Sequence, residues 1–450
     1  MAESIAKYQQ YAEYKNSGVE WLGEIPKDWE VVRLKYIAEL SGNKISGSEN
    51  QYVGLENVES KTGKFKVTEG IVSEGVSNTF EKDNLLFGKL RPYLAKSWLA
   101  SFSGICSSEF LVLNSQLVHP KFLKYMTLTD EFIEQVNSST YGSKMPRASW
   151  DFIGLLRLPV MDYYVSETIA NFLDHETAQI DTLIEKQQTL IQLLKEKRQA
   201  VISHAVTKGL NPDAPMKDSG VEWLGEVPEG WTIPQIGYHS KVTKLTGFEY
   251  TNLWRPNMEG SIIALRGFNI QERYLDLSKT EKITEELSNK LERSKLHEGD
   301  IVLPCTGTLG NAALIQESNL YHINQNIAKV SINKKLFKPE FAVFWMTSLP
   351  FRQMIDFNNT SGMQPVLLIG DIRKLPIPLA PLSEQQEIID FLLIKVEQFD
   401  RLIDNAEQAI QLMQERRTAL ISSAVTGKID VRNWQNPNYN NNEAQTELSQ

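Results

Sequence analysis

The sequence predicts a mixed α/β fold that is built twice, with two long helices that form an antiparallel coiled coil. Two repeats carry this prediction. The segment SGVEWLGEIPKDW at residues 17–29 returns as SGVEWLGEVPEGW at residues 219–231, a shift of 202. A long amphipathic helix then returns at a shift of 219. The order of Trp-containing segment, mixed domain and long helix therefore occurs twice, and it gives the chain a pseudo-twofold internal repeat.

The first long helix is predicted over residues 166–208, which contain neither proline nor glycine. Its apolar residues recur at three and four positions, a stripe that includes Leu183 and Leu190. The second helix is predicted over residues 383–428 and repeats this stripe, with Leu402 in place of Leu183. A helix of this length, roughly 58 Å over its central part, needs a partner for its apolar face. We therefore expect the two helices to pair, with one mixed domain near each end.

The helices and the repeated segments divide the rest of the chain. Residues 1–16 are expected to be a mobile or partner-bound leader, and residues 209–218 a linker that contains two prolines. The two mixed domains, each opening with its Trp-containing segment, are residues 17–160 and 219–381. The Asn/Gln-rich tail from residue 433 to 450 is expected to be disordered.

Inside the mixed domains the two copies share a skeleton but little sequence. In the first copy we expect strands at 52–58, 84–87 and 109–113, and a helix at 120–134. Their counterparts in the second copy are 262–270, 300–303, 324–330 and 339–349, with the second and third strands both related by a shift of 216. Polar loops are predicted after the second strand and after the helix of each copy. The scaffold is thus repeated while the domains between its parts have diverged.

Composition limits the possible functions. The chain has 450 residues, a net charge of −9 and two cysteines, Cys106 and Cys305, which exclude a disulfide framework and are expected in the core. It shows no signal sequence and no apolar run that could span a bilayer, which indicates a cytoplasmic protein. The acidic balance argues against binding nucleic acid through phosphate contacts alone. However, the central parts of the mixed domains, residues 44–158 and 237–380, carry a small basic excess of +1 and +3, so a local DNA surface is compatible with the charge.

The two Trp-containing segments, together with the helix ending LLKEKRQAVISHAVTKGL, resemble the specificity subunit of type I restriction-modification enzymes. The resemblance covers nearly the whole chain, leaving out the leader and the tail. The second helix departs from the first where it ends, with VTGKID in place of VTKGL. The tandem order of segment, variable domain and helix is the hallmark of that family, and the sequence follows it.

The resemblance implies a noncatalytic subunit that sets DNA sequence specificity. Each variable domain would be a target recognition domain that reads one half of a bipartite, asymmetric site in double-stranded DNA, and the helices would set the gap. Two modification subunits would methylate adenine N6 with S-adenosylmethionine. Restriction subunits would translocate the DNA with ATP and Mg²⁺ and cut it. This chain itself would bind no cofactor, and the whole complex would serve in phage defence.

Base reading in the major groove requires Arg or Lys for guanine and Asn or Gln for adenine. The predicted polar loops supply such side chains at corresponding places in the two copies. An alternative for each residue is a solvated loop position or a phosphate contact. The DNA-binding candidates are Lys89, Arg91, Ser143, Lys144 and Arg147 in the first copy, and Thr306, Thr308, Asn311, Asn359, Ser361 and Gln364 in the second.

The Trp-containing segments and the outer faces of the helices are the candidate docking surfaces for other subunits. Core packing is the alternative for each tryptophan. No catalytic or metal-binding motif is present: the sequence has no P-loop, no Asn/Asp-Pro-Pro-aromatic loop for a flipped adenine, and no histidines at metal-ligand spacing. A coiled-coil scaffold that binds proteins without reading DNA remains the competing hypothesis. The docking candidates are Trp21, Leu22, Trp29, Trp223, Leu224 and Trp231.

Overall fold

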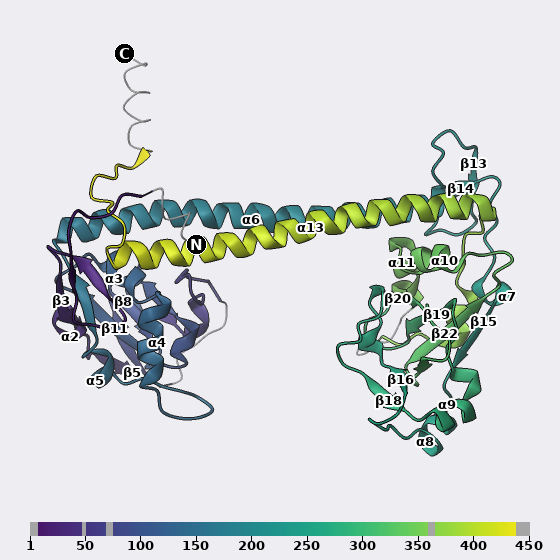
Figure 1. The fold of residues 1–450 in the computed structure, drawn as a ribbon, viewed down its shortest axis with the longest axis horizontal. Helices are drawn as coiled ribbons and strands as arrows, with labels where there is room; N and C mark the ends of the chain where they lie inside the picture. Colours follow the sequence, from purple (N-terminus) through teal and green to yellow (C-terminus); the bar gives the residue numbers. More distant parts are fainter. Residues whose placement is uncertain (1–7, 47–50, 69–74, 359–364, 438–450) are drawn as a thin grey trace, which may run out of the picture. The chain divides into compact units, whose positions relative to one another are not determined.

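The computed structural model describes residues 8–46, 51–68, 75–358 and 365–437 (Figure 1). The chain divides into two compact units. Unit 1 comprises residues 1–188 and 407–450, and unit 2 comprises residues 189–406. The two long helices, α6 (Tyr163–Lys208) and α13 (Leu382–Val425), each contribute one half to each unit. Both units have the mixed α/β fold that the sequence predicts.

Unit 1 contains two four-stranded sheets and two short strand pairs. The first sheet has the order β4-β11-β8-β9, and the second has the order β5-β7-β10-β6, in which only β10 and β6 are parallel. The strand pairs are β1 with β2 and β3 with β12, both antiparallel. The strands are β1 (Tyr14–Asn16), β2 (Glu24–Pro26), β3 (Glu30–Arg33), β4 (Ala38–Leu40), β5 (Lys44–Ser46), β6 (Tyr52–Val53), β7 (Val76–Phe80), β8 (Leu85–Gly88), β9 (Ser97–Leu99), β10 (Gly104–Cys106), β11 (Phe110–Ser115) and β12 (Arg157–Val160).

The first sheet of unit 1 shares a core with the helices (Figure 1). Phe87 of β8 and Leu113 of β11 belong to the same buried cluster as Leu173 of α6 and Leu420 of α13. The smaller second sheet has a core of its own around Trp98 and Phe110. The helices of the mixed domain are α2 (Leu34–Ile37), α3 (Pro120–Met126), α4 (Asp130–Ser138) and α5 (Trp150–Ile153), with 3-10 turns η1 (Leu55–Asn57) and η2 (Pro92–Leu94).

Unit 2 repeats this plan with a five-stranded sheet, β15-β22-β19-β20-β17, and a three-stranded sheet, β18-β16-β21. The strand pair β13 with β14 corresponds to β1 with β2. The strands are β13 (Met216–Asp218), β14 (Glu226–Pro228), β15 (Ser240–Lys244), β16 (Ile262–Leu265), β17 (Glu272–Arg273), β18 (Glu281–Ile283), β19 (Asp300–Pro304), β20 (Ala312–Leu314), β21 (Tyr321–Ile323) and β22 (Ile327–Ile332). The helices are α7 (Ile236–His239), α8 (Gly247–Asn252), α9 (Glu285–Lys290), α10 (Pro339–Met346), α11 (Leu349–Asn358) and α12 (Ile369–Lys374), with η3 (Gly267–Asn269) and η4 (Glu292–Ser294).

The register of the paired strands refines the predicted correspondence between the copies. In unit 1, Phe87 of β8 pairs with Leu111 of β11, and in unit 2, Leu303 of β19 pairs with Ala328 of β22. The shift is therefore 216 for β8 and β19 but 217 for β11 and β22. The predicted common shift of 216 was wrong by one residue for β22, because the structure aligns Asn326 with Glu109.

The helix predicted at 120–134 is divided in the structure. It is broken between α3 and α4, where the hydroxyl of Thr129 accepts a hydrogen bond from the Phe132 N–H (3.3 Å) and caps α4. The helix predicted at 339–349 is likewise divided between α10 and α11. The predicted strands at 52–58 and 262–270 shorten to β6 and β16, since each then turns into a 3-10 helix.

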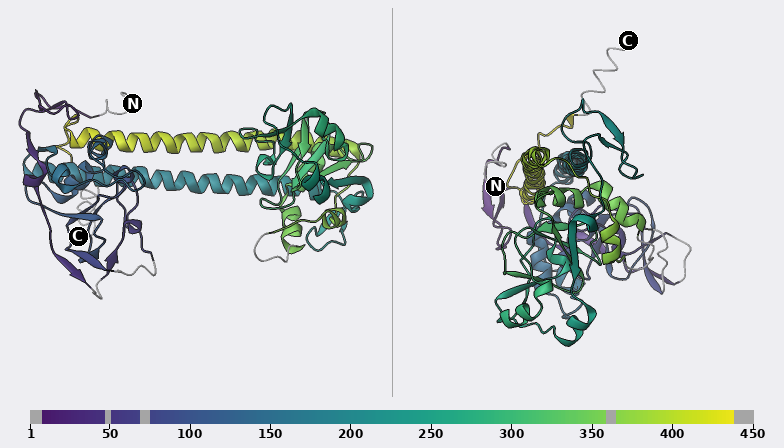
Figure 2. Two further views of the ribbon diagram at one scale, coloured as in Figure 1. Left: turned by 90° about the horizontal axis from the view of Figure 1, so that it is seen from below. Right: turned by 90° about the vertical axis from the view of Figure 1, so that its right-hand side faces the viewer.

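In each unit the two long helices run antiparallel and share a core (Figure 2). The first half of α6 packs with the second half of α13 in unit 1, and the converse pairing occurs in unit 2. Part of the predicted stripe is wrong, because Leu183, Leu190 and Leu402 are exposed. No helix within the described residues is long and apolar enough to span a membrane.

The ends of the chain contribute to unit 1. Tyr11, within the predicted leader, is buried against Trp29, and β1 completes a strand pair. Trp434, within the predicted tail, packs edge-on against Phe172 of α6. Packed structure therefore extends into both segments, while residues 1–7 and 438–450 lie outside the described part of the chain.

Candidate nucleic-acid interface

The structure brings the two predicted DNA-binding loops of unit 1 together. The loop that follows β8 runs beside the segment that follows α4. The Ala148 N–H donates to the Lys89 carbonyl (3.0 Å), and the Arg91 N–H donates to the Pro146 carbonyl (2.7 Å). Lys89, Arg91, Ser143, Lys144 and Arg147 thus belong to one junction of two loops, although more than fifty residues separate the loops in sequence.

Three of these side chains are accessible. Arg91 is exposed and lies in the left-handed backbone region, with φ of 50°. Ser143 and Lys144 are exposed in a turn that two backbone hydrogen bonds between Tyr141 and Arg147 close, both 3.0 Å long. Within the described residues neither Arg91 nor Lys144 forms an ion pair, so both present cationic groups to solvent, the state that a contact with phosphate or guanine requires.

Arg147 differs from Arg91 because Glu109 already binds its guanidinium. Its Nε lies 3.1 Å from both carboxylate oxygens of Glu109, and its Nη2 lies 2.9 Å from Oε1. These hydrogen bonds raise the pKa of Arg147 above its ordinary value. The bidentate pair uses the guanidinium edge that would bind guanine. In this conformation Arg147 positions the loop, and the accessible cations lie beside it.

Unit 2 contains the same loop junction. The Leu367 N–H donates to the Cys305 carbonyl (2.8 Å), and Thr306 forms an isolated bridge with Val366. In unit 1 the corresponding contacts join Ala148 to Lys89 and Arg147 to Leu90. The shifts are 216 for the loop after the strand and 219 for the second loop, so the backbone arrangement has been duplicated with the rest of the unit.

The predicted residues of unit 2 occupy different environments. Thr308 is exposed and Thr306 is half-buried. Asn311 is committed to the fold, because its side-chain amide donates to the Ile270 carbonyl (3.0 Å). The remaining three predictions, Asn359, Ser361 and Gln364, lie outside the described residues.

The two junctions differ in charge. The ion pair of Glu109 and Arg147 in unit 1 is replaced in unit 2 by Asn326 and Val366, according to the register of the strands and loops. Neither replacement carries a charge. The same backbone arrangement therefore carries charged side chains in unit 1, where Arg91 and Lys144 are also exposed, and uncharged side chains at the described positions of unit 2.

Exposed aromatic and apolar side chains at the junctions were not predicted from the sequence. Tyr93 and Tyr141 are exposed in unit 1, and Val366 and Leu368 are exposed in unit 2. Such side chains can stack on bases or contact a thymine methyl group. Tyrosines beside the predicted cations in both loops of unit 1 were a sequence signal that could have identified them.

Most of the predicted docking residues in the Trp-containing segments are buried. Leu22, Trp29, Leu224 and Trp231 lie in the cores of their own units, so the core-packing alternative is correct for both of these tryptophans. Trp21 is half-buried and Trp223 is exposed, with its ring centroid 5.0 Å from that of Phe357. The four buried side chains cannot form a surface for a partner in this structure.

The buried tryptophans instead pack against the ends of the long helices. Gly427 follows α13 with φ of 74°, and a Cβ at this position would lie 2.4 Å from Pro26 Cδ and 3.0 Å from the Trp29 ring. Gly209 follows α6 with φ of 71°, and a Cβ there would lie 3.5 Å from the Trp231 ring. Each Trp-containing segment thus packs against a glycine at the end of a long helix. A residue with a side chain would be strained at this position, because only glycine adopts a positive φ at little cost.

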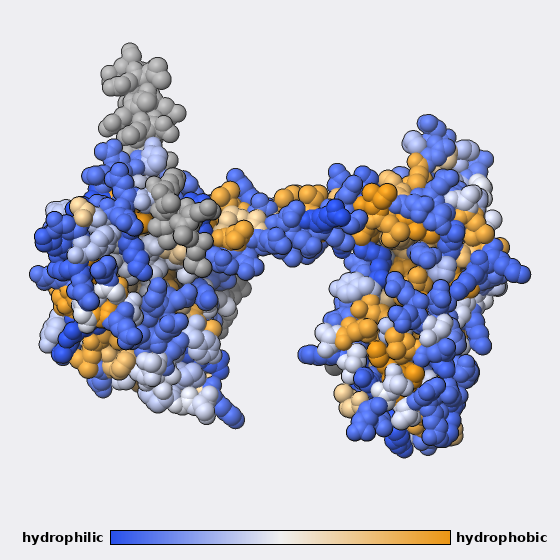
Figure 3. Space-filling view, viewed as in Figure 1, coloured by the Kyte–Doolittle hydropathy of each residue, from blue (hydrophilic) through white to orange (hydrophobic). Residues whose placement is uncertain are grey.

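Exposed leucines on the long helices form a different candidate surface for partners. Leu183 and Leu193 of α6 are exposed, and so are Leu402 and Leu412 of α13, which correspond to them at a shift of 219. Unit 1 therefore presents Leu183 and Leu412, and unit 2 presents their counterparts Leu402 and Leu193. Figure 3 shows apolar side chains on the surface of the helices. Paired exposed apolar residues on a repeated scaffold are a feature of a protein-binding surface.

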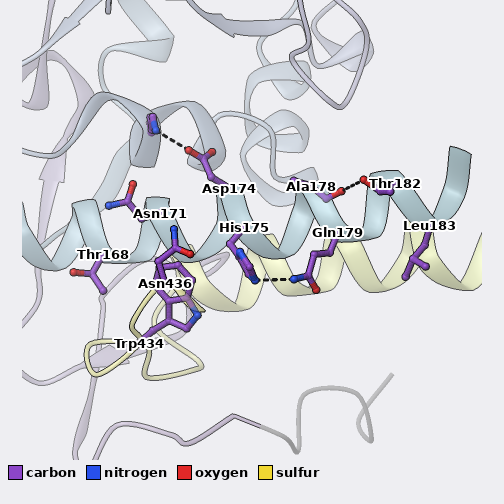
Figure 4. Close-up of a pocket in the computed structure, with 11 residues that line it drawn as sticks. Thr168, Asn171, Asp174, His175, Ala178, Gln179, Thr182, Leu183, Trp434 and Asn436 are labelled. Carbon is purple, nitrogen blue, oxygen red and sulfur yellow. Dashed lines mark hydrogen bonds and ion pairs between the residues drawn. The ribbon is translucent and has the colours of Figure 1, made fainter. Parts of the chain in front are cut away.

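A hollow of about 940 Å³ in unit 1 lies on α6 beside Trp434 (Figure 4). Its walls are mostly uncharged polar side chains, including Asn171 and Gln179, together with the ion pair of Lys121 and Asp174 (2.7 Å). Within the described residues, no group of histidine, cysteine, aspartate or glutamate could hold a metal ion. Cys106 and Cys305 are buried, and burial raises the pKa of the Cys106 thiol to about 12, so they are core residues as predicted.

The duplicated units and their paired long helices define a class of α/β proteins that are built from a tandem repeat. Residues 257–413 match the family model described as the type I restriction modification DNA specificity domain. The chain is 23% identical over 325 residues to the EcoBI specificity subunit of Escherichia coli, covering 68% of this chain and 65% of that protein. It is 22% identical to the MjaVIII specificity subunit of Methanocaldococcus jannaschii, covering 91% and 95%.

Solved structures show the same fold. The HsdS subunit from Thermoanaerobacter tengcongensis matches with a TM-score of 0.52 at 15% identity, covering 90% of this chain and 98% of that chain. A chain from a structure described as the "structural basis underlying complex assembly and conformational transition of the type I R-M system" matches with a TM-score of 0.65 at 16% identity, covering 90% and 99%. In sequence and in fold the chain is therefore similar to type I restriction-modification specificity subunits.

Proposed function

We propose that this chain is the noncatalytic DNA specificity subunit of a type I restriction-modification complex, and that each unit reads one half of a bipartite, asymmetric site. The observation that supports this most directly is the duplicated loop junction. Both units use the same backbone contacts to present two loops, yet the side chains on those loops differ in charge. A repeated frame with different surfaces suits the recognition of two different half-sites.

The chemistry of the two junctions predicts different modes of reading. In unit 1, Arg91 and Lys144 would contact guanine edges or phosphates, and Tyr93 and Tyr141 would add apolar contacts. In unit 2, Thr306 and Thr308 would use hydroxyl groups, and Val366 would contact a thymine methyl group. The half-site of unit 1 would therefore depend more strongly on salt concentration than the half-site of unit 2.

The long helices would set the gap between the half-sites and hold the other subunits. The matched exposed leucines, Leu183 with Leu402 and Leu193 with Leu412, are suited to two copies of one partner. We assign this role to two modification subunits, which would bring S-adenosylmethionine and methylate adenine N6. Restriction subunits would bring ATP and Mg²⁺ for translocation and cleavage. The complex would act on DNA in the cytoplasm.

Co-expression with a modification subunit encoded beside this chain, followed by sequencing of methylated adenines in the host DNA, tests the proposal. We expect one split, asymmetric methylated motif that disappears when this chain is omitted. A stable complex that methylates no specific sequence would contradict the reading function, and would favour the competing role of a protein-binding scaffold.

A further inference from the structure

The two long helices are joined by the same ion pair in both units. In unit 1, Arg417 Nε of α13 lies 3.0 Å from Asp181 Oδ1 of α6. In unit 2, Arg198 of α6 binds Asp400 of α13. A shift of 219 converts Asp181 to Asp400 and Arg198 to Arg417. The ion pair is therefore part of the duplicated scaffold, with the donor and the acceptor exchanged between the helices.

Each ion pair is extended by one charged residue from the mixed domain. In unit 1, Lys64 Nζ lies 2.9 Å from Asp181 Oδ2. In unit 2, Glu272 Oε2 lies 3.4 Å from Arg198 Nη2. The domain thus binds the acidic member of the pair in unit 1 and the basic member in unit 2. We call these groups the unit 1 triad (Asp181, Arg417 and Lys64) and the unit 2 triad (Arg198, Asp400 and Glu272).

Lys64 and Glu272 come from corresponding parts of their domains. Each follows a 3-10 turn that a buried asparagine stabilises. Asn57 accepts from the Gly54 N–H (2.8 Å) and donates to the Lys66 carbonyl (3.0 Å). Asn269 likewise accepts from the Arg266 N–H (2.8 Å) and donates to the Asp276 carbonyl (2.7 Å). A turn held on both sides by hydrogen bonds presents its charged neighbour to the helices in a defined position.

The unit 2 triad is embedded in further charges. Arg273 Nη1 lies 2.6 Å from Glu272 Oε1, and Arg352 Nη2 lies 3.7 Å from Glu272 Oε2. Burial lowers the pKa of Arg273, and Glu272 opposes this shift. Arg352 also lies against Gly310, since a Cβ at Gly310 would be 2.7 Å from Arg352 Cγ. The network of charged side chains that begins at the helices therefore reaches Gly310, which follows Thr308 of the loop junction.

The triads can fix the position of the helices because hydrogen bonds between charged groups depend on direction. Apolar packing is not directional, so it allows two helices and a domain to slide or tilt with little cost. Hydrogen bonds between charged groups need short distances and defined angles. In unit 1 the bonded side chains of Asp181 and Arg417 are largely buried, so loss of one leaves the other poorly solvated. Fixing register is the best-attested role of buried ion pairs of this kind.

We propose that the two triads are positioning devices that fix the register of the helix pair and the orientation of each recognition domain on it, and so make the complex accept only one gap length. This proposal rests on the proposed DNA-reading function for its consequence, but not for the positioning role itself. We assign no DNA contact to Lys64 and Glu272. Each holds its recognition domain in position through its ion pair with α6.

The test uses the unit 1 triad and two measurements. Lys64→Met removes the domain's bond, Asp181→Asn weakens both bonds of the triad, and Lys64→Arg keeps the charge. Lys61→Met is the matched control, because Lys61 is an exposed lysine in the same hairpin and forms no ion pair with the part of the chain that the structure describes. Spin labels at Glu81→Cys and Gln188→Cys, both exposed sites in unit 1, report the distance between the domain and α6. The native cysteines are buried and leave the labelling selective.

We expect a wider label-to-label distance distribution in the Lys64→Met and Asp181→Asn chains, and wild-type distributions in the Lys64→Arg and Lys61→Met chains. In complexes with the modification subunit, methylation at gaps one base pair too long or too short should rise about two- to fivefold for Lys64→Met relative to the native gap. The bases of both half-sites should stay the same.

Unchanged distances in both the Lys64→Met and Asp181→Asn chains would overturn the positioning role. Altered half-site bases, or an equal loss of methylation at all gaps, would overturn the link from the triads to gap length. If the wild-type complex methylates no split site, the proposed function fails, and the spin-label distances still decide the positioning role.

Discussion

Two arginines at the unit 1 loop junction show how a neighbouring residue determines the role of a side chain. Arg91 and Arg147 belong to loops that share backbone hydrogen bonds. Glu109 binds the guanidinium of Arg147 in a bidentate ion pair, whereas Arg91 is exposed. We therefore assign base or phosphate contact to Arg91 and loop positioning to Arg147.

Arg91→Ala should weaken recognition of one half-site only. Loss of a bidentate guanine contact costs about 1–3 kcal/mol in binding free energy. The backbone of residue 91 is left-handed, and alanine has a Cβ as arginine does, so the substitution leaves the backbone strain unchanged. The measurement is methylation of DNA libraries in which each half-site is varied in turn. Equal weakening on scrambled DNA would show that Arg91 contacts phosphate and reads no base.

Glu109→Gln should release Arg147 for contact with DNA. The amide keeps the shape of the side chain but loses the charge that neutralises the guanidinium. The salt dependence of DNA binding should then steepen by about one unit of logarithmic slope, as expected for one additional phosphate contact. An unchanged slope, measured by titration of DNA at several salt concentrations, would show that Arg147 stays away from the DNA.

The sequence could identify the loops of this site but not the state of each side chain in them. Turn-forming residues and the repeat marked both loops, and the structure joins them as a pair in each unit. The ion pair of Glu109 and Arg147 links residues 38 positions apart, so it depends on the register of β8 and β11. Local sequence patterns do not encode that register, and the same limit explains why Asn311 proved to bind the Ile270 carbonyl.

Among the elements, the long helices were predicted most accurately because their signal is long and periodic. The structure begins α6 at Tyr163 and ends it at Lys208, close to the predicted 166–208. Shorter helices were less predictable, since Thr129 caps α4 and divides a segment that has helical composition throughout. The apolar stripe also misled at Leu183 and Leu402. Apolar periodicity indicates a face of a helix, but it does not show whether that face meets the core or a partner.

Gly427→Ala should destabilise the junction of α13 with the first Trp-containing segment. A left-handed residue other than glycine costs about 1–2 kcal/mol, and the overlap of the new Cβ with Pro26 adds to this cost. We expect a total loss of about 2–4 kcal/mol in the free energy of unfolding, measured with denaturant.

Gly18→Ala is the matched control for this change. Gly18 also has positive φ, 70°, but a Cβ there would have no atom within 4 Å. Its substitution should therefore cost only the backbone strain. Equal losses for the two variants would contradict the packing of the Trp-containing segment onto the helix end.

At the scale of the whole molecule, the duplication explains the division of labour. The parts that repeat closely in sequence, namely the Trp-containing segments and the helices with the ion pair that joins them, are structural. The loop junctions repeat in backbone but differ in charge, and they are the parts that we assign to DNA. The repeat was readable in the sequence because the scaffold residues changed little. The correspondence of the junctions became visible only through hydrogen bonds such as those of Lys89 and Cys305.

The measurement that tests this account most directly is the methylated motif of a chain whose helices are each shortened by one heptad. Deletion of residues 186–192 and 405–411 removes corresponding parts of α6 and α13, and it keeps both triads and the four exposed leucines that we assign to partner binding. Seven residues shorten a helix by about 10 Å, or about three base pairs of DNA, with little rotation. We predict the same two half-sites separated by a shorter gap. A motif with altered half-site bases would contradict the assignment of reading to the units and of spacing to the helices.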